Sequence, residues 1–323
     1  MVSEQSSRRP AGTTSVGNEP KHALQVATAE AIAHHGELLQ GVFEGSDGRL
    51  HRGLLTLPFP SQYTRATLWP SLEPGVRTRP LDRNKARRAV ALTFDHLRVS
   101  PVGGDLTLES SIAMGHGYGS STADVVAAIR AAAMAANVHL RRSTVSRLAV
   151  EAEDASDAII YEDRPVLFAH REGFILEHFG DEFPPLIVVG FRDGAASTVN
   201  TLSLPPARYD SEEIELFRVL RGLASRSIRY QDPSLLGRVA TLSARISQRH
   251  LPKPGWQRAL ELTEAANACG LQVAHSGTLF GILFDGEAAG VRAQASKLVT
   301  LAQQAGFAQV QSFALNLERS ALE

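Results

Sequence analysis

The chain has 323 residues, of which 43% are hydrophobic and 21% are charged, and its formal net charge is -1. This length allows two domains of ordinary size, and the nearly balanced charge gives no broad attraction to nucleic acid or to an anionic membrane. The single cysteine, Cys269, excludes an intramolecular disulfide and a cysteine-based metal cluster, and a reducing cytoplasm is the expected compartment.

The chain is expected to begin with a disordered tail over residues 1–21, which contain almost no side chains that a core could bury. This segment lacks the order of charged and then apolar residues that marks a signal peptide. No apolar run in the chain approaches the ~18–20 residues that span a bilayer. A soluble, cytoplasmic protein with no membrane partner is therefore expected.

The first half is predicted to form strands and then helices. Short apolar stretches separated by turn residues predict strands at 23–32, 53–57, 64–69 and 106–109, with a helix near 85–97. Residues 123–136 contain eight alanines, which favours a helix. Another helix is predicted from Ser143 or Thr144 as N-cap to about Asp154.

The second half is predicted to begin with strands at 165–170, 174–179 and 186–191. Asp210 and Glu213 form a capping-box pattern, and Asp232-Pro233 is typical of a second helix start. A third helix from Trp256 is expected to end near Gly270. Strands at 271–274 and 279–284, a helix to residue 306 and a strand at 309–317 complete an α+β layout. The expected domains are 22–182 and 183–323.

A glycine-rich run precedes the alanine-rich helix. Gly115, Gly117 and Gly119 permit positive φ and let backbone N–H groups approach an anion, and Ser120 and Ser121 then open the helix. A helix N-terminus also favours phosphate through its free N–H groups and its dipole. A plain strand-to-helix turn is the alternative. The spacings of a Walker P-loop and of the dinucleotide fingerprint are absent.

The segment Ser111–Asp124 resembles the second motif of the GHMP kinases, the superfamily of galactokinase, homoserine kinase and mevalonate kinase. Within it, residues 120–124 are similar to the version in the L-threonine kinases of cobalamin synthesis. Ala113 and His116 depart from the usual proline and lysine. The resemblance implies an ATP-binding loop made of Gly115, His116, Gly117, Tyr118, Gly119, Ser120, Ser121 and Thr122.

Two further segments resemble the other GHMP motifs, in the family's order. Residues 36–41 resemble the first motif of the threonine-kinase branch, and residues 274–281 resemble the third motif. Taken alone, they read as a turn and a hairpin. A zinc site at the adjacent histidines and Glu37 is not expected, because neighbouring strand residues point to opposite faces. The resemblance implies that the substrate pocket includes His35, Gly36, Glu37, Gln40, Ser276, Gly277 and Thr278.

A carboxylate cluster, Glu151, Glu153, Asp154 and Asp157, follows the second motif. A cation would relieve the repulsion within it, and a solvated acidic helix end is the alternative. GHMP kinases carry a Glu followed by an Asp at this point, as metal ligand and, in the mevalonate kinase branch, as catalytic base. The resemblance implies that Asp157 is catalytic and that Mg²⁺ is bound by Ser120 or Ser121 with Glu151 or Glu153.

The resemblance covers about residues 24–317 and implies a two-lobed α+β fold, with an N-terminal ribosomal-protein-S5-like lobe and a C-terminal ferredoxin-like α/β lobe. The implied reaction is ATP-dependent phosphorylation of an alcohol, with L-threonine as the best acceptor and O-phospho-L-threonine as the product. Arg52, Arg65, His35 and Thr278 are candidate contacts for the substrate carboxylate. A homodimer is left open.

The sequence also allows functions other than a threonine kinase. The acceptor is alternatively homoserine, serine or a biosynthetic intermediate. The same fold includes ATP-dependent decarboxylases and proteins that only bind ligands, which fold alone does not separate. Nucleic-acid binding is not expected, because the basic residues at 83–88 and 141–147 are not interleaved with a series of stacking aromatics.

Overall fold

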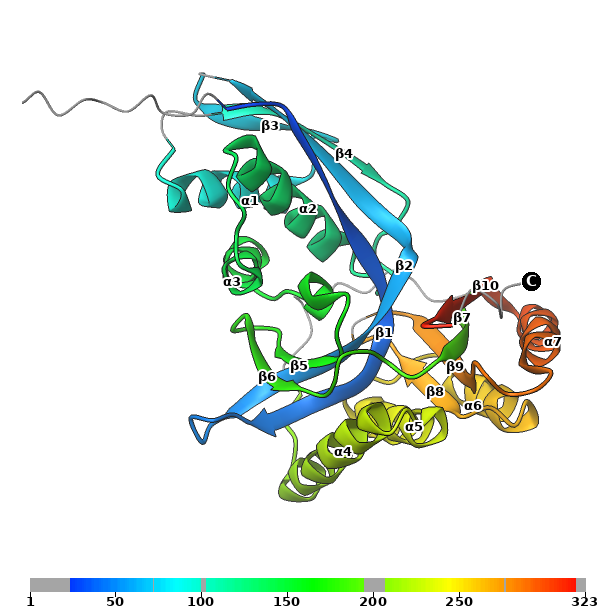
Figure 1. Cartoon of the computed structure of the whole chain (residues 1–323). Coiled ribbons are helices and arrows are strands. Elements are labelled where there is room, and N and C mark those ends of the chain that lie inside the picture. Colours follow the sequence, from blue (N-terminus) through cyan, green and yellow to red (C-terminus); the bar gives the residue numbers. More distant parts are fainter. Residues whose placement is uncertain (1–23, 72, 100–102, 195–206, 276, 318–323) are drawn as a thin grey trace, which may run out of the picture.

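The computed structural model describes residues 24–71, 73–99, 103–194, 207–275 and 277–317, which form an α+β fold (Figure 1). The strands are β1 (Ala27–Glu44), β2 (Leu50–Ser71), β3 (Gly75–Arg79), β4 (Gly103–Ser110), β5 (Val166–Ala169), β6 (Phe174–His178), β7 (Leu186–Asp193), β8 (Gly270–Val273), β9 (Leu279–Asp285) and β10 (Phe307–Leu315). The helices are α1 (Asn84–His96), α2 (Ser120–Ala135), α3 (Arg142–Glu153), the short 3-10 helix η1 (Ala158–Tyr161), α4 (Ser211–Arg229), α5 (Pro233–His250), α6 (Trp256–Ala265) and α7 (Val291–Gln304).

One sheet connects all the described strands, in the order β10-β7-β9-β8-β1-β2-β4-β3, with β5 paired to β2 and β6 paired to β5. The pair β3–β4 is parallel, and the others are antiparallel. The long hairpin of β1 and β2 crosses the middle of the molecule (Figure 1). A single residue pair, Glu37 opposite Val273, joins β1 to β8. The first motif therefore lies where the two parts of the sheet meet.

Helices cover the two parts of the sheet separately (Figure 1). In the first part, α2 lies against β1 and β2 and is covered by α1 and α3. Alanines such as Ala127, Ala128 and Ala132 are fully buried, because α2 has neighbours on almost every side. Small side chains permit this close packing on several faces. In the second part, α4 and α5 pack on β1, α5 also packs on β8, and α7 covers β7 and β10.

The capping box at Asp210 and Glu213 and the proline start of α5 are confirmed. Several predicted elements are wrong. The strand at 23–32 and the turn at residues 36–41 belong to one strand, β1. The strands at 53–57 and 64–69 belong to one strand, β2, and β3 is not predicted at all. The helix from Trp256 ends at Ala265 rather than near Gly270. Gly270 lies in β8, where an added Cβ would approach the Gly237 carbonyl oxygen to 2.0 Å, so this glycine serves close packing rather than a helix cap.

The tail at 1–21 lies outside the described residues. The boundary expected near residues 180–185 falls between β6 and β7, and the division into domains 22–182 and 183–323 remains a prediction. Among the described helices, none is both long and apolar enough to cross a membrane.

Candidate active site

Three glycines shape the loop between β4 and α2. Gly115, Gly117 and Gly119 have positive φ angles of 77°, 98° and 72°. A Cβ on Gly117 would lie 2.7 Å from that of Ala274, and one on Gly119 would lie 2.2 Å from the His34 ring. Both packing and conformation therefore require glycine here. Gly119 offers no side-chain cap to α2, so the N–H groups of its first turn are available to an anion.

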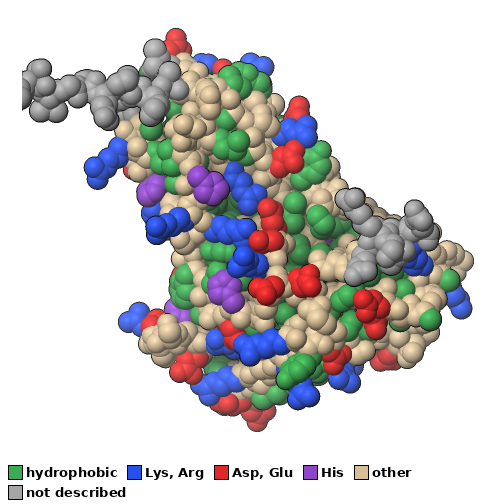
Figure 2. Space-filling view, viewed as in Figure 1, with side chains coloured by type: hydrophobic (Ala, Val, Ile, Leu, Met, Phe, Trp, Pro, Cys, Tyr) green, Lys and Arg blue, Asp and Glu red, His purple; other side chains and the backbone are tan. Residues whose placement is uncertain are grey.

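The loop forms one wall of a cavity of about 330 Å³. Figure 2 shows basic, histidine and acidic side chains gathered across the middle of the molecule. His116 and Tyr118, which were expected in the ATP site, do not line the cavity. Its wall from the loop and α2 consists of Gly115, Gly117, Gly119, Ser120, Ser121 and Thr122. The other lining residues are His34, Glu37, Gln40, Arg52, Lys85, Glu153, Ala155, Asp157, His170, Arg171, Ala207, Tyr209, Ser247, His250, Leu251 and His275.

The end of α3 places Glu153 beside the start of α2. Its carboxylate accepts hydrogen bonds from the hydroxyls of Ser121 and Thr122, each 2.8 Å long. The Nζ atom of Lys85 lies 3.8 Å from the same carboxylate. Burial raises the pKa of Glu153 to about 7, and the charge of Asp157 adds to this rise. A cation at the mouth of the loop would therefore stabilise the ionised form of Glu153.

The two glutamates considered as metal ligands differ in their positions. Glu151 is exposed, pairs with Arg147 at 3.9 Å and does not line the cavity. Glu153 contacts Ser121, and Ser120 lines the same cavity. The structure therefore brings together Ser120, Ser121 and Glu153, and leaves Glu151 outside the site.

A turn after α3 brings Asp157 back toward β1. Asp154 has a φ of 69° and ends the helix. Asp157 Oδ2 lies 3.0 Å from His34 Nε2 and 3.2 Å from Thr122 Oγ1, whose single proton it shares with the closer Glu153 carboxylate. Burial opposes ionisation of Asp157, but the attraction of His34 outweighs burial and lowers the pKa of Asp157 to about 2. Burial also opposes protonation of His34, yet Asp157, helped by Glu37, raises the pKa of His34 to about 9. The two side chains are an ion pair at neutral pH.

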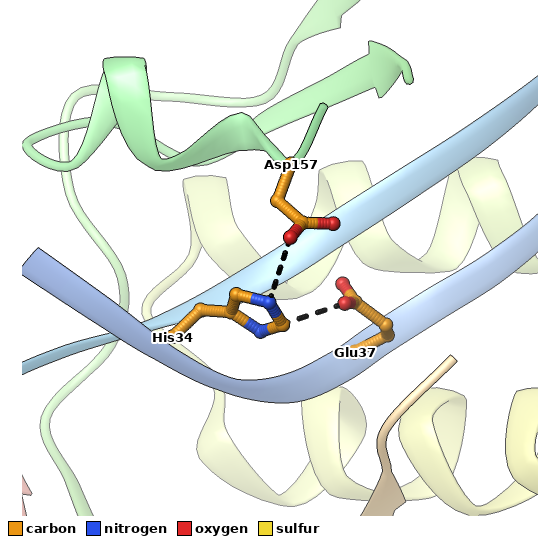
Figure 3. Close-up of side chains that lie close together, drawn as sticks. All are labelled: His34, Glu37 and Asp157. Atoms are coloured by element: carbon orange, nitrogen blue, oxygen red, sulfur yellow. Dashed lines mark hydrogen bonds and ion pairs between the residues drawn. The ribbon is translucent and has the colours of Figure 1, made fainter. Parts of the chain in front are cut away.

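An irregularity in β1 places His34 and Glu37 on the same side (Figure 3). Gly36 has a φ of 71°, and the register of β1 against β2 shifts between His34 and Glu37. Without this bulge, strand alternation would send the two side chains to opposite faces. Glu37 Oε1 lies 3.7 Å from His34 Nδ1. Burial and the charge of Asp157 raise the pKa of Glu37 to about 7, against the attraction of His34.

His35 points away from the cavity, which corrects its expected contact with substrate. Its ring packs with the buried side chains of Phe59, Tyr118 and Phe313. Burial lowers the pKa of His35 to about 3, so the ring is neutral. The adjacent residue His34 faces the cavity instead. Gly36 shapes the bulge and does not line the cavity.

Two more histidines, His170 and His275, lie beside each other in the cavity wall, with ring centroids 5.4 Å apart. His275 Nδ1 is 3.0 Å from Gln40 Oε1, and His170 Nδ1 donates to the carbonyl oxygen of Arg52 at 3.1 Å. Burial lowers the pKa of His170 to about 4 and that of His275 to about 3. Both rings are therefore neutral at physiological pH. Because Nδ1 of His170 carries the proton, its Nε2 is a hydrogen-bond acceptor.

Residues of the third motif contact the backbone of the glycine loop and hold it in position. The Thr278 N–H donates to the His116 carbonyl oxygen at 3.1 Å, and Lys253 Nζ donates to the Gly277 carbonyl oxygen at 2.6 Å. A Cβ on Gly277 would lie 2.1 Å from the His116 oxygen. Neither Gly277 nor Thr278 lines the cavity, and both contact the glycine loop. The substrate contact expected of them stays a prediction. Ser276 lies outside the described residues.

The site contains residues that sequence reasoning missed. His34 lies just before the first motif and His275 belongs to the third motif, so both could have been found from the motifs. Lys85 and His170 belong to segments without a motif, and only the fold brings them to the cavity. Of the arginines considered for the substrate carboxylate, Arg52 lines the cavity. Arg65 pairs with Glu30 at 2.7 Å instead.

Known proteins share sequence with this chain. A family profile described as "GHMP kinases N terminal domain" matches residues 84–160. The L-threonine kinase of Salmonella typhimurium is 30% identical, over 80% of this chain and 83% of its own length. That of Citrobacter freundii is 28% identical, over 80% and 87%.

Solved structures share the fold. Homoserine kinase from Cytophaga hutchinsonii matches with a TM-score of 0.65 and 15% identity, over 94% of this chain and 96% of its own. Mevalonate pyrophosphate decarboxylase from Streptococcus pyogenes matches with a TM-score of 0.64 and 10% identity, over 92% and 98%. The α+β fold of the GHMP kinases expected from the sequence is therefore confirmed.

Proposed function

This chain belongs to the GHMP kinase superfamily, and from that premise we propose that it phosphorylates the hydroxyl group of L-threonine, giving O-phospho-L-threonine and ADP. It is an ATP-dependent phosphotransferase that acts on a small molecule. The observation that carries the proposal is the convergence of the glycine loop, Glu37, Gln40 and Asp157 on one cavity. Arg52 lines it too, so that it offers both signs of charge to a zwitterionic amino acid.

The residues at the mouth of the loop fit ATP and Mg²⁺. The free N–H groups at the start of α2 and the glycine backbone suit phosphate oxygens. Ser121 and Glu153 supply hard oxygen atoms, the ligands that Mg²⁺ prefers. When bound, Mg²⁺ neutralises charge on the phosphates. Lys85 Nζ lies 3.2 Å from Ser121 Oγ and adds a positive charge at the same place.

Asp157 is the proposed partner of the acceptor hydroxyl. Its carboxylate faces the cavity and is held in position by His34 and Thr122. A carboxylate with so low a pKa is a weak base. Phosphoryl transfer needs little activation of the nucleophile, so Asp157 chiefly orients the hydroxyl and takes its proton late in the reaction. The ion pair with His34 keeps Asp157 ionised and ready to do so.

A screen of acceptors tests the substrate. L-threonine, L-serine, L-homoserine and simple alcohols would each be incubated with MgATP, with ADP release and the mass of the product both recorded. We expect ADP and phosphothreonine in equal amounts. Reaction of another alcohol while threonine stays inert would refute the acceptor. Release of ADP without a phosphorylated product would instead indicate a decarboxylase.

The substitution Asp157→Asn tests the chemistry. The amide keeps the size of the side chain but accepts no proton, so kcat should fall by about 10²–10⁴-fold, the usual range for a general base. The KM for ATP should change little, because Asp157 does not belong to the loop. Steady-state kinetics would check both, with Glu151→Gln as the control outside the cavity. Wild-type turnover in Asp157→Asn would exclude this role.

A further inference from the structure

Three side chains on one side of the cavity form a compact group, here named the His34 cluster: His34, Glu37 and Asp157. Each offers one ligand atom, and these atoms all lie within 4.8 Å of one another. Two come from β1 and the third from the turn before η1, and Figure 3 shows them pointing toward one another. The bulge at Gly36 creates the cluster, because it turns Glu37 to the side of His34.

The His34 cluster contains ligand atoms that the described part of the protein leaves unused. Both carboxylate oxygens of Glu37 and Nδ1 of His34 lack a hydrogen-bond partner of standard geometry there. Yet Glu37 is 1% exposed and His34 is 4% exposed. Buried polar atoms are nearly always hydrogen-bonded, so these atoms are open to a further partner. The charge that balances the two carboxylates is the proton on His34, and a metal ion that enters from the cavity would take the place of that proton.

We propose that His34, Glu37 and Asp157 bind a transition metal ion of the zinc class, at a site separate from the Ser121–Glu153 pair proposed for Mg²⁺. One imidazole and two carboxylates suit Zn²⁺, Co²⁺ or Mn²⁺, whereas Mg²⁺ prefers oxygen ligands alone. All three residues line the cavity, which gives the ion an entry path. With three protein ligands, the fourth position of a tetrahedral ion is open to water or to a substrate oxygen.

Such an ion has a consequence for the reaction. It would engage the Asp157 carboxylate, which the acceptor hydroxyl also needs, so metal binding and phosphoryl transfer compete for one side chain. This consequence rests on the proposed role of Asp157. The binding of the ion does not, and it is measurable without ATP or threonine.

Titration of the untagged, metal-stripped chain with Co²⁺ tests the proposal. We expect one equivalent to bind, with visible absorption bands typical of nitrogen and oxygen ligation. His34→Gln and Glu37→Gln should each weaken binding by more than about 100-fold, because outer-shell partners alone account for about 10–100-fold. Glu151→Gln, which lies outside the cavity, should bind Co²⁺ like the wild type.

Three outcomes would overturn the site. They are undiminished Co²⁺ binding in both His34→Gln and Glu37→Gln, loss of binding in Glu151→Gln, or loss in His170→Gln and His275→Gln with the cluster variants unaffected. Circular dichroism would confirm that each variant is folded. Anomalous diffraction from Zn²⁺-soaked wild-type crystals needs no variant. A peak among the three side chains supports the proposal, and a peak only elsewhere refutes it.

Discussion

At the scale of single residues, the site depends on glycines that bring segments close together. Gly36 makes the bulge in β1, and a Cβ at this position would lie 2.0 Å from Gln272 Oε1. Gly48, by contrast, has a nearly identical φ of 72° but no atom within 4 Å of an added Cβ. The two positions therefore separate the cost of backbone strain from the cost of a clash.

Gly36→Ala is expected to destabilise the protein and to abolish most of its activity. Gly48→Ala should cost about 1–2 kcal/mol, the usual penalty of a left-handed conformation for a residue with Cβ. Gly36→Ala should cost more, because Gln272 or the bulge must also move, which displaces Glu37. Urea unfolding and kcat would measure both effects. Equal stability and equal turnover in the two variants would contradict the importance of the bulge.

Glu153 and Glu151 offer a second matched pair. Glu153→Gln should raise the Mg²⁺ concentration required for half-maximal activity by about tenfold or more, equivalent to about 1.4 kcal/mol, and Glu151→Gln should leave it unchanged. Burial raises the pKa of Glu153 to about 7, so Mg²⁺ should bind more weakly as pH falls below about 7 and the carboxyl gains a proton. Mg²⁺ titrations at pH 6 and pH 8 would show whether this dependence is present and is lost in Glu153→Gln. Equal Mg²⁺ requirements in the two variants would argue against Glu153 as the ligand.

Residue-level prediction succeeded for the loop glycines and failed for the paired histidines. The loop is local, so composition and order suffice to place Gly115 to Thr122 at the start of a helix. The choice between His34 and His35 depends on strand register, which a bulge shifts. Strand alternation correctly separates the two histidines. Alternation also predicts that Glu37 and His34 point to opposite faces of the strand, but the bulge places them on the same side.

At the scale of elements, α2 is fixed by a buried carboxylate. Asp124 accepts a hydrogen bond from the Thr64 hydroxyl of β2 at 2.8 Å and lies 3.0 Å from Arg83 Nε at the start of α1. It belongs to the motif at residues 120–124 but does not line the cavity. Its contribution is to hold the first turns of α2 in place, and with them the glycine loop. A motif residue can therefore matter for position alone.

Asp124→Ala is expected to lower the free energy of unfolding by about 2–3 kcal/mol, because it removes a buried hydrogen bond from Thr64 and an ion pair with Arg83. Thr64 keeps its contact with Ser110, and Arg83 keeps its pair with Asp82. Asp105→Ala removes an exposed pair with Arg77 and should cost at most about 1 kcal/mol. Urea denaturation of both variants provides the comparison. Equal losses would mean that Asp124 does not anchor the helix.

Helices were predictable where one residue pattern continues through the whole element, as in α2. They were also predictable where the sequence shows the capping residues, as in α4 and α5. Strands were not predictable where their pairing is irregular or where no adjacent hairpin marks them. β2 continues between its two predicted parts, and its pairing with β1 carries several register shifts there. β3 is short and pairs with β4 in parallel, so no adjacent hairpin signals it.

At the scale of the whole molecule, the cavity is built from the two parts of the sheet. The first motif lies at the single pairing that joins β1 to β8, and His275 follows β8. Residues far apart in the chain therefore share one wall, such as Gln40 and His275. The order of three motifs was enough to predict this fold by resemblance. The neutral histidines in the wall were not predictable, because only tertiary contacts bury them.

These buried histidines couple the folding of the whole chain to pH. Burial lowers the pKa of His170 to about 4 and that of His275 to about 3, below the ordinary value of 6.5. Between pH 6.5 and about 4 these histidines therefore bind more protons in the unfolded chain than in the native chain. The contribution of these histidines to stability should fall as pH falls through this window, whereas Glu37 and Glu153, whose pKa values are raised to about 7, contribute in the opposite direction. His170→Gln should remove up to one proton from the histidine contribution to the slope.

Urea unfolding at intervals from pH 4.5 to 7.5 would measure this slope, with His139→Gln at an exposed position as the control. The stability of the wild type and that of His139→Gln should change in parallel on acidification, and that of His170→Gln should fall less or rise more. His34 acts in the opposite direction, because its pKa is raised to about 9. The stability that it contributes is complete below pH 6.5 and is lost as pH rises through about 9. Identical slopes below pH 6.5 in all three proteins would mean that His170 is not held neutral in the folded cavity wall.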